Sequence, residues 1–333
     1  MKATIYDVAR EAGVSIATVS NVMNGKGKVS KKRSELIMKV MEKLNYQPSA
    51  IASALVGKKT FTLGLLLPDI SNPFFAELAR AIEDEAHDSG YCVMICSTDN
   101  KDERVERYLS LLEQKRVDGI MIGTGVENTI LLSRLQAESI PIVQIARENA
   151  LPSVNTVVTD DEMGGRLAAR HLAELGHRRI AILSENLRVS SSRERIQGCR
   201  RELEERDIPL EDRNIVICEF SVEEGRRGAR ELLSRSDKPT ALFCCNDLLA
   251  IGAMQVAKQL GIQVPEQLSI VGFDDTLLAT VSDPPLTTVA QPIEQMGKHA
   301  VSLLVDDLIN GVSDNSRIVL CPELRVRRST GPV

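Results

Sequence analysis

The sequence contains no tryptophan, and aromatic residues make up only 3% of its 333 positions. Aliphatic side chains must therefore build the core, and a hydrophobic content of 43% is enough to supply them. No run of about 18 apolar residues is present, so no membrane span is predicted. The N-terminus "MKATIYDVAR" lacks the apolar stretch of a signal peptide, which predicts a cytoplasmic protein.

The seven cysteines do not have the spacing of a metal site. The sequence has neither a CxxC pair nor a cluster of its four histidines. Cys92, Cys96, Cys244 and Cys245 fall in the apolar, strand-like runs "YCVMICS" and "ALFCCND". They are predicted to be buried, reduced thiols, and neither a metal ion nor another cofactor is expected.

Motifs that mark enzymes on α/β folds are absent as well. There is no GxGxxG after a strand, no GxSxG turn and no Walker loop. A sugar-binding transport protein is a further alternative to an enzyme. Such a protein would need a signal peptide and would lack a basic N-terminal segment, and this sequence meets neither requirement. These absences argue against both an enzyme and a transport protein.

Charge is distributed unevenly along the chain. Residues 1–59 hold 11 Lys or Arg and 4 Asp or Glu, a balance of +7, whereas the remainder carries −12 of the total of −5. A small basic segment on a large acidic body indicates that the first segment binds a polyanion such as DNA. A solvated basic helix face is the simpler alternative.

Helix start and stop signals divide the basic segment into three helices. Thr4 can cap a helix over "IYDVAREA", with Asp7 completing a capping box, and Gly13 ends it. Ser15 caps a second helix that ends at Asn24-Gly25. Ser30 caps a third over residues 31–46. The spacing of the first two predicts a helix-turn-helix.

The second helix, "SIATVSNVMNG", carries small residues on its outward side. Ile16, Ala17, Ser20 and Asn21 would let its backbone approach base edges in a major groove, while hydroxyls near its start reach phosphates. A helix packed between two others would need apolar residues on both sides. Ser20 and Asn21 argue against that alternative.

From residue 61 onward, apolar runs alternate with amphipathic stretches. Runs such as "FTLGLLLPD", "RIAIL" and "LSIVGFDD" read as strands, and stretches such as "GGRLAARHLAELG" read as helices. This βαβ rhythm predicts parallel sheets covered by helices, and the length predicts two Rossmann-like halves. Ligands of such folds bind at the carboxyl ends of the strands, where "PDISN", "CCND" and "GFDD" place polar groups.

The segment "TIYDVAREAGVSIATVSNVMNG", continued by "VSKKRSELIMKVMEKLNYQPSAIASAL", resembles the DNA-binding head of the LacI/GalR family of bacterial repressors. The resemblance implies a recognition helix at 16–24 and a hinge helix within "PSAIASAL", with Leu55 inserted into the minor groove. It implies contacts to operator DNA by Thr4, Ser15, Ile16, Ala17, Thr18, Ser20, Asn21, Asn24, Ser30, Ser49, Ala52 and Leu55.

The body is similar to the periplasmic-binding-protein-like (type I) effector domain of the same family. The segments "NPFF", "RERIQG", "NDLLAIG", "GFDDT" and "TVAQP" carry this similarity. It implies a sugar or related metabolite as the effector, bound by Asn72, Phe74, Phe75, Arg147, Arg195, Phe220, Asn246, Asp274 and Gln291. Carboxylates, amides and guanidinium groups suit paired hydroxyls, and aromatic rings suit the apolar face of a sugar.

The resemblance also implies the domain organisation. Residues 1–47 would form the helix-turn-helix domain, 48–60 the hinge and linker, and 61–333 the effector and dimerisation domain. Within the last, one half would comprise about 61–160 with 293–320, and the other about 161–292 with 321–333. The family pattern further implies a homodimer on a pseudo-palindromic operator.

Four positions depart from patterns found in the family, and three of them lie in the hinge and the body. The hinge commonly has Arg at the position of Ser53, and the body often has Asp at the position of Ala146, so one hydroxyl-binding carboxylate is missing. Some relatives also bind a phosphocarrier protein through an Arg where this chain has Asp283. An acidic residue there would repel a phosphoserine, which argues against that partner.

Asn21 stands where the family commonly has an arginine that contacts guanine, whereas asparagine is suited to adenine. The variant Asn21→Arg is therefore expected to shift operator preference toward guanine at one symmetric position, with about 1–3 kcal/mol of discrimination. Selection of binding sites from a randomised duplex pool measures this. An operator preference identical to that of the parent chain would contradict a base-reading role for Asn21.

Overall fold

The computed structural model describes residues 3–23, 29–46, 59–126, 140–148, 154–311 and 315–333. Its contacts divide the chain into two compact units, Met1–Thr60 and Phe61–Val333. None of the helices in the described part of the chain has the length and hydrophobicity needed to cross a bilayer.

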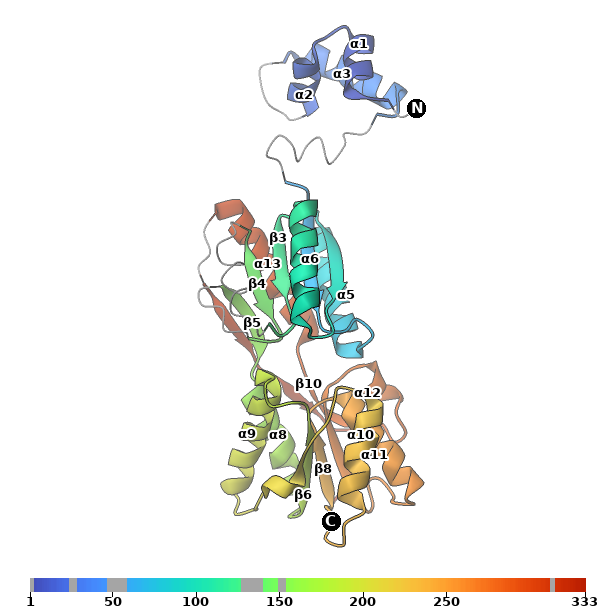
Figure 1. Ribbon diagram of the computed structural model, residues 1–333, viewed down its shortest axis with the longest axis vertical. Helices are drawn as coiled ribbons and strands as arrows, with labels where there is room; N and C mark the ends of the chain where they lie inside the picture. Colours follow the sequence, from blue (N-terminus) through green and yellow to red (C-terminus); the bar gives the residue numbers. More distant parts are fainter. Residues whose placement is uncertain (1–2, 24–28, 47–58, 127–139, 149–153, 312–314) are drawn as a thin grey trace. The chain divides into compact units, whose positions relative to one another are not determined.

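The first unit contains helices α1 (Ile5–Ala12), α2 (Ile16–Met23) and α3 (Lys31–Lys43) (Figure 1). Each helix is too short to be stable alone in water, so their stability comes from packing around a shared core. Buried side chains from all three helices form that core: Val8, Ala9, Ala12, Val19, Ile37 and Val40. The predicted three-helix unit is confirmed.

The caps of α1 set the geometry of the turn to α2. The Asp7 carboxylate accepts hydrogen bonds from the Thr4 backbone N–H at 2.9 Å and from the Thr4 hydroxyl at 2.6 Å. Gly13 ends the helix at φ +62°, a left-handed conformation that costs glycine little. The Val14 N–H then closes the turn on the Ala9 carbonyl at 3.0 Å. Both sequence signals thus act as predicted.

The third helix is shorter than predicted. It ends at Lys43 instead of continuing to Tyr46. Asn45 adopts φ +46°, and the Tyr46 N–H bonds back to the Met41 carbonyl at 2.8 Å. Asparagine tolerates this left-handed conformation better than most residues, which is why the helix stops there.

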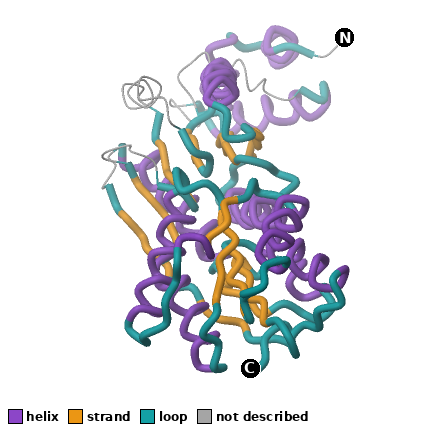
Figure 2. The backbone as a smooth tube through the Cα atoms, turned by 60° about the horizontal axis from the view of Figure 1, so that its bottom comes forward, coloured by secondary structure: helices purple, strands orange, loops and turns teal. Residues whose placement is uncertain are grey.

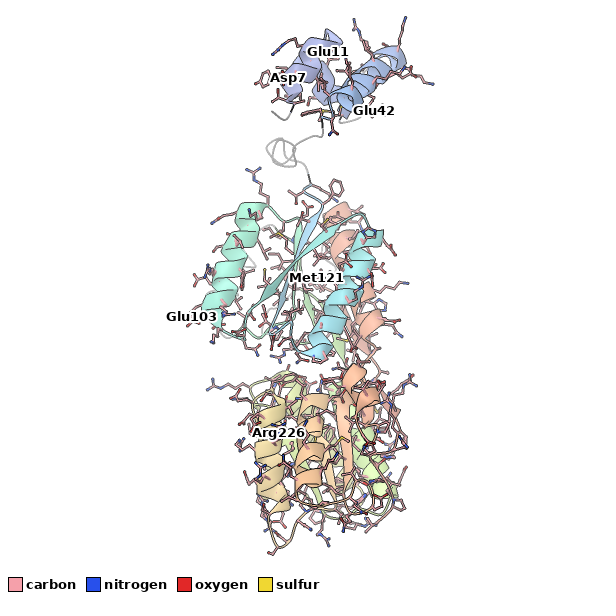
Figure 3. The ribbon with its side chains drawn as sticks, turned by 90° about the vertical axis from the view of Figure 1, so that its right-hand side faces the viewer. Asp7, Glu11, Glu42, Glu103, Met121 and Arg226 are labelled. Carbon is pink, nitrogen blue, oxygen red and sulfur yellow. The ribbon has the colours of Figure 1, made fainter. Side chains whose placement is uncertain are left out.

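The second unit contains two six-stranded sheets. The first has the order β11-β5-β4-β3-β1-β2, and all its strand pairs are parallel. Its strands are β1 (Thr62–Leu67), β2 (Cys92–Ser97), β3 (Gly119–Ile122), β4 (Ile142–Ile145), β5 (Asn155–Thr159) and β11 (Arg317–Leu320). Helices α5 (Pro73–Asp88) and α13 (Ile293–Asn310) pack with one face of this sheet, and α6 (Asp102–Lys115) packs with the other. Met121 of β3 lies in its interior (Figure 3).

The second sheet has the order β12-β10-β9-β8-β6-β7. Its strands are β6 (Ile180–Ser184), β7 (Ile215–Ile217), β8 (Ala241–Cys244), β9 (Ser269–Asp274), β10 (Thr287–Ala290) and β12 (Glu323–Arg325). The edge strand β12 runs antiparallel to β10, so this sheet is not wholly parallel as the βαβ rhythm alone suggested. β12 lies near the C-terminus and enters the second sheet at its edge without a crossover helix, so it can pair with β10 in the antiparallel direction.

Helices cover both faces of the second sheet. On one side lie α8 (Asp161–Glu174) and α9 (Ser190–Glu204), and on the other lie α10 (Val222–Leu233), α11 (Asp247–Gln259) and the short α12 (Leu277–Val281) (Figures 1 and 2). A 3-10 turn (Asp212–Asn214) precedes β7. Arg226 of α10 donates to Gln255 Oε1 of α11 at 2.6 Å (Figure 3).

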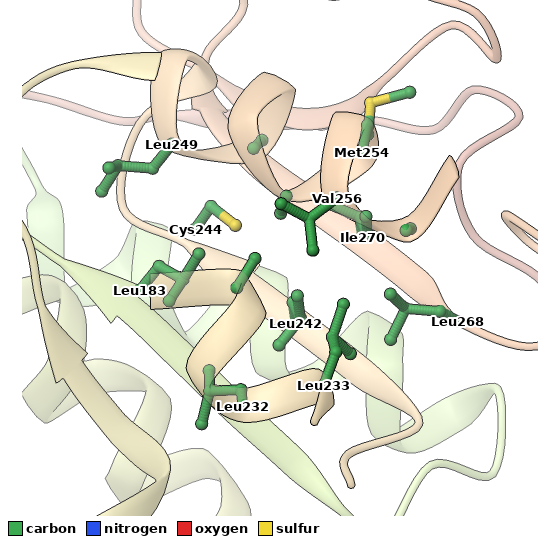
Figure 4. Close-up of a cluster of buried hydrophobic side chains, with 14 of the residues drawn as sticks. Leu183, Leu232, Leu233, Leu242, Cys244, Leu249, Met254, Val256, Leu268 and Ile270 are labelled. Atoms are coloured by element: carbon green, nitrogen blue, oxygen red, sulfur yellow. The ribbon is translucent and has the colours of Figure 1, made fainter. Parts of the chain in front are cut away.

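Aliphatic residues fill the core of this half, as the lack of tryptophan required. The cluster under α10 and α11 includes Leu183, Leu232, Leu242, Leu249 and Ile270, all buried (Figure 4). Cys244 lies in the same cluster and Cys245 in the cluster on the opposite face. Burial of Cys92 was a wrong prediction, because Cys92 is exposed at the start of the edge strand β2.

The chain passes between the two sheets three times. It crosses after β5, after β10 and between β11 and β12. Each half therefore contains segments far apart in sequence, since α13 packs with the first sheet although it follows β10 of the second. The two halves are joined by three crossover segments. Any movement of one half relative to the other must therefore change the backbone conformation of these segments.

Helices α8 and α9 approach each other closely through two glycines. A Cβ atom on Gly165 would overlap the Arg195 carbonyl, and one on Gly198 would overlap the Glu162 carbonyl. Glu202 adds an ionic contact to this helix pair, since its carboxylate accepts from Arg170 Nε at 2.9 Å and from Arg206 Nε at 3.0 Å. The arginine hydrogen bonds lower the pKa of Glu202 to about 2.

Gly198→Ala is expected to lower the free energy of unfolding by about 2–3 kcal/mol, because the added methyl forces α8 and α9 apart. Chemical unfolding followed by circular dichroism measures the loss. Gln197→Ala on the exposed side of the same helix is the control and should change stability by less than about 0.5 kcal/mol. Equal effects of the two substitutions would contradict the close backbone contact.

Candidate functional site

The outward face of α2 is exposed and carries small or polar side chains. Ser15, Ile16, Ala17 and Asn21 are exposed, Thr18 and Ser20 are half-buried, and Val19 is fully buried in the three-helix core. One side of α2 is therefore packed in the three-helix core, and the opposite side is exposed. The predicted recognition surface is available for contact with another molecule.

The start of α2 is held by two hydroxyl side chains. Ser15 Oγ accepts from the Thr18 N–H at 3.1 Å and lies 2.8 Å from Thr18 Oγ1. The N-terminus of a helix carries a partial positive charge, and hydroxyls placed there are suited to phosphate oxygens. Lys31, Lys32 and Arg33 are exposed in the first turn of α3 and add positive charge to this unit.

The remaining predicted DNA contacts are placed as follows. Thr4 and Ser30 are exposed and stand at the starts of α1 and α3. Asn24, Ser49, Ala52 and Leu55 lie outside the described residues, as does most of the predicted hinge. Their roles stay predictions.

A cavity of about 380 Å³ lies between the two sheets of the second unit. A smaller cavity shares three of its lining residues, Arg147, Glu185 and Phe220. The lining residues follow the carboxyl ends of strands in both sheets, which is where open α/β sheets bind ligands. Seven of the nine predicted ligand contacts line these cavities: Phe74, Phe75, Arg147, Arg195, Phe220, Asp274 and Gln291.

Asn72 and Asn246 are the two predicted contacts that are not among the lining residues of the two cavities. Each caps a helix: Asn72 Oδ1 accepts from the Phe74 N–H at 3.0 Å, and Asn246 Oδ1 accepts from the Leu249 N–H at 2.8 Å. The Nδ2 atom of each is buried without a hydrogen-bond partner in the described part of the chain. The caps explain why these helices begin there, while a ligand role for the two residues stays a prediction.

Arg147 lies on the side of the first sheet, directly after β4. Its Nη1 donates to Asn100 Oδ1 at 3.0 Å, its Nη2 is 3.7 Å from Glu185 Oε2, and its guanidinium carbon is 5.7 Å from the Phe75 ring centroid. The Arg147 side chain is only 10% exposed. It therefore bridges the two halves of the unit, because Glu185 follows β6 of the second sheet.

Arg195 lies on α9 at the side of the second sheet. Its Nε donates to Asp161 Oδ1 at 2.6 Å and its Nη1 to the Cys245 carbonyl at 2.5 Å. Nη1 is also 3.8 Å from Asp274 Oδ1, and the guanidinium stacks 3.6 Å from the centroid of Phe273. The sequence predicted a ligand contact for this arginine. The structure shows the ion pair on a residue that also lines the cavity.

Gln291 connects the two sheets at one crossover. Its Nε2 donates to Asp274 Oδ1 at 2.7 Å, and its Oε1 accepts from the Thr159 hydroxyl at 2.8 Å. Thr159 ends β5 of the first sheet and Asp274 ends β9 of the second. A ligand that touched Asp274 or Gln291 would therefore act on a hydrogen-bonded link between the two halves.

Burial sets the protonation chemistry of the cavity. It raises the pKa of Asp274, Asp161 and Glu185 above the usual range of carboxyl groups, and the two arginines oppose this shift. No group of three or more His, Cys, Asp or Glu residues in the described ranges could hold a metal ion. The site therefore offers hydrogen bonds and charge to a ligand.

Sequence reasoning missed several groups of this site. Asn100, Asp161 and Glu185 each follow shortly after a strand of one of the two sheets. The rule that polar residues gather at carboxyl ends of strands would have found them, had it been applied to "STDN", "TDDE" and "SEN". Glu185 matters most, because it places a carboxylate in a cavity that seemed short of one at Ala146.

Comparisons with known proteins identify the family of both parts of the chain. Residues 4–49 match the family described as bacterial regulatory proteins, lacI family, and residues 169–330 match a periplasmic binding protein-like domain. The chain is 45% identical to the HTH-type transcriptional regulator DegA of Bacillus subtilis (strain 168), with 100% of this chain and 99% of DegA covered. The chain belongs to the LacI family.

Solved structures of LacI-family proteins share the whole fold. The lac repressor dimer bound to operator and the anti-inducer ONPF matches with a TM-score of 0.89 and 28% identity over 99% of this chain and 100% of that chain. A LacI-family regulator of Enterococcus faecium with bound ribose matches with a TM-score of 0.75 and 31% identity over 82% and 99%. This LacI-family chain is a DNA-binding transcription regulator and not an enzyme.

The pairing of Arg195 makes this residue important for the stability of the LacI-family chain. Arg195→Ala is expected to lower the free energy of unfolding by about 3–5 kcal/mol, because it leaves the Asp161 carboxylate buried without its cation. Urea unfolding measures the loss. Arg193→Ala, on the exposed side of α9, is the control and should cost less than about 1 kcal/mol. Similar losses in both variants would contradict a buried, stabilising pair.

Proposed function

We propose that this LacI-family regulator is a cytoplasmic repressor that binds a pseudo-palindromic operator as a homodimer. In this proposal residues 1–47 read the DNA, 48–60 form the hinge and 61–333 bind the effector and the second subunit. The division of the chain after Thr60 supports these boundaries. The lac repressor, which the chain matches over nearly its whole length, was solved as a dimer on its operator.

The exposed face of α2 would enter the major groove. Ile16, Ala17 and Asn21 are exposed on a helix anchored by Val19, and Ser15 with Thr18 hold the helix start where a phosphate can approach. Two such helices on a dimer would contact half-sites about one helical turn apart. Thr4, Asn24, Ser30, Ser49, Ala52 and Leu55 complete the proposed DNA contacts.

The effector would bind in the cavity between the two sheets. The observation that carries this proposal is that two cavities share Arg147 and Phe220 in their linings, and that the smaller one adds Arg195, Asp274, Gln291 and the ring of Phe75. Polar groups that flank aromatic rings are suited to a sugar or a related metabolite. A volume of about 380 Å³ is sufficient for a small ligand. The ribose-bound relative from Enterococcus faecium supports this choice.

Control of DNA binding would follow from the position of the ligand between the halves. Arg147 and Glu185 meet across the cavity, and Gln291 links Thr159 to Asp274 at a crossover. A ligand that replaces or strengthens these contacts favours one relative orientation of the halves over the other. The phosphocarrier partner is not part of the proposal, because Asp283 stands at its docking position.

Selection of the full chain against a randomised duplex pool at about 0.15 M salt tests the DNA-binding part. The expected result is an enriched pseudo-palindrome, whose affinity for the chain changes when glucose, ribose or cellobiose is added. Binding without an enriched sequence would contradict sequence-specific recognition. An enriched operator whose affinity responds to none of these sugars would contradict control by a neutral sugar effector.

A further inference from the structure

Among the described residues, the carboxylate of Glu185 presents a buried acceptor to the cavity without a hydrogen-bond partner. Glu185 is 6% exposed and lines both cavities. Its Oε2 accepts from the Ser192 hydroxyl at 3.4 Å and lies 3.7 Å from Arg147 Nη2. Its Oε1 is buried and has no hydrogen-bond partner among the residues that the structure describes. A buried polar atom without a partner costs free energy, so it is usually matched by something else.

The cations near Glu185 are already paired. Arg147 is shared between Asn100 and Glu185, and Arg195 is held by Asp161 and the Cys245 carbonyl, with Asp274 nearby. Two buried arginines thus lie among three buried carboxyl groups. A ligand that brought a further negative charge would meet Glu185 without an uncommitted arginine of this pair to compensate it.

We propose that the effector donates a hydrogen bond to Glu185 Oε1, and that this carboxylate selects neutral or amino-bearing sugars over sugar acids and sugar phosphates. This inference rests on the proposed function, because it takes the cavity as the effector site. Hydroxyl and ammonium groups share the chemistry that Glu185 requires, namely an N–H or O–H donor. Glu185 thereby supplies the carboxylate that the sequence lacks at Ala146.

The position of Glu185 explains how it discriminates. It follows β6 on the second sheet while its partner Arg147 follows β4 on the first, so a donor that reaches Glu185 lies between the two halves. Phe220 lines the same part of the cavity and offers a ring to the apolar side of a sugar. Burial raises the pKa of Glu185, but the charge of Arg147 opposes this shift and favours the ionised carboxylate. Because the effective dielectric constant is low there, the ionised carboxylate attracts a donor and repels an anion more strongly than it would in water.

Thermal shift and calorimetric titration of the full chain with matched sugars test the inference. The panel comprises glucose, galactose, ribose and cellobiose, the amino sugars glucosamine and galactosamine, the acids glucuronate and galacturonate, and the phosphates of glucose and ribose. At least one neutral or amino sugar is expected to bind at least tenfold more tightly than its anionic counterpart. Tighter binding of an acid or a phosphate, or no binding by any member, would overturn the proposal.

The variant Glu185→Gln separates the two kinds of donor. Glutamine keeps a carbonyl acceptor, so a hydroxyl donor should lose affinity only a few-fold, whereas an ammonium donor should lose at least about tenfold. Glu204→Gln, which removes an exposed carboxylate of α9 that lines neither cavity, is the matched control and should leave affinities unchanged. Equal effects of the two variants would overturn the role of Glu185.

Operator binding distinguishes this inference from the proposed function. If a donor-bearing sugar binds with the expected dependence on Glu185 but does not change operator affinity, the selectivity stands and the effector function fails. If a sugar controls operator affinity equally in the parent chain and in Glu185→Gln, the effector function stands and the selectivity fails. If Glu185→Gln does not fold, the matched panel on the parent chain still decides the selectivity.

Discussion

The ion pair between Arg195 and Asp161 is the interaction on which the second half of the body and its cavity depend. Arg195 is almost wholly buried, and its charge is held there by the Asp161 carboxylate, the Cys245 carbonyl and the ring of Phe273, with Asp274 nearby. That geometry in turn requires α8 and α9 to touch through Gly165 and Gly198. A backbone contact between two helices thus determines where the cavity places its polar groups.

Some of the contacts that connect the two halves of the body lie where the effector is proposed to bind. The groups that line the cavity also connect the halves of the body, since Arg147 meets Glu185 across the sheets and Gln291 bridges Thr159 and Asp274. A ligand at this place would contact groups that hold the halves together. This is the physical basis for coupling a small molecule to DNA affinity in the proposed function.

Much of the fold and part of the site were predictable because they depend on local rules. The capping box at Thr4 and Asp7, the left-handed Gly13 and the alternation of strands with helices follow from backbone geometry and hydrophobic patterning. The third helix stopped at Lys43 and Cys92 proved exposed. The end of the helix at Asn45 is a local signal that was overlooked, whereas the exposure of Cys92 depends on the edge position of β2, which a single segment does not show.

The sequence by itself determined that a basic three-helix unit precedes a body of parallel sheets, because charge distribution and periodicity are properties of neighbouring residues. Only the tertiary structure decided which polar groups meet at the cavity. Glu185 and Arg147 are separated by 37 positions and come from different sheets, so no spacing relates them. Their pairing, and the Glu185 oxygen that it leaves without a partner, arise from how the two halves fold against each other.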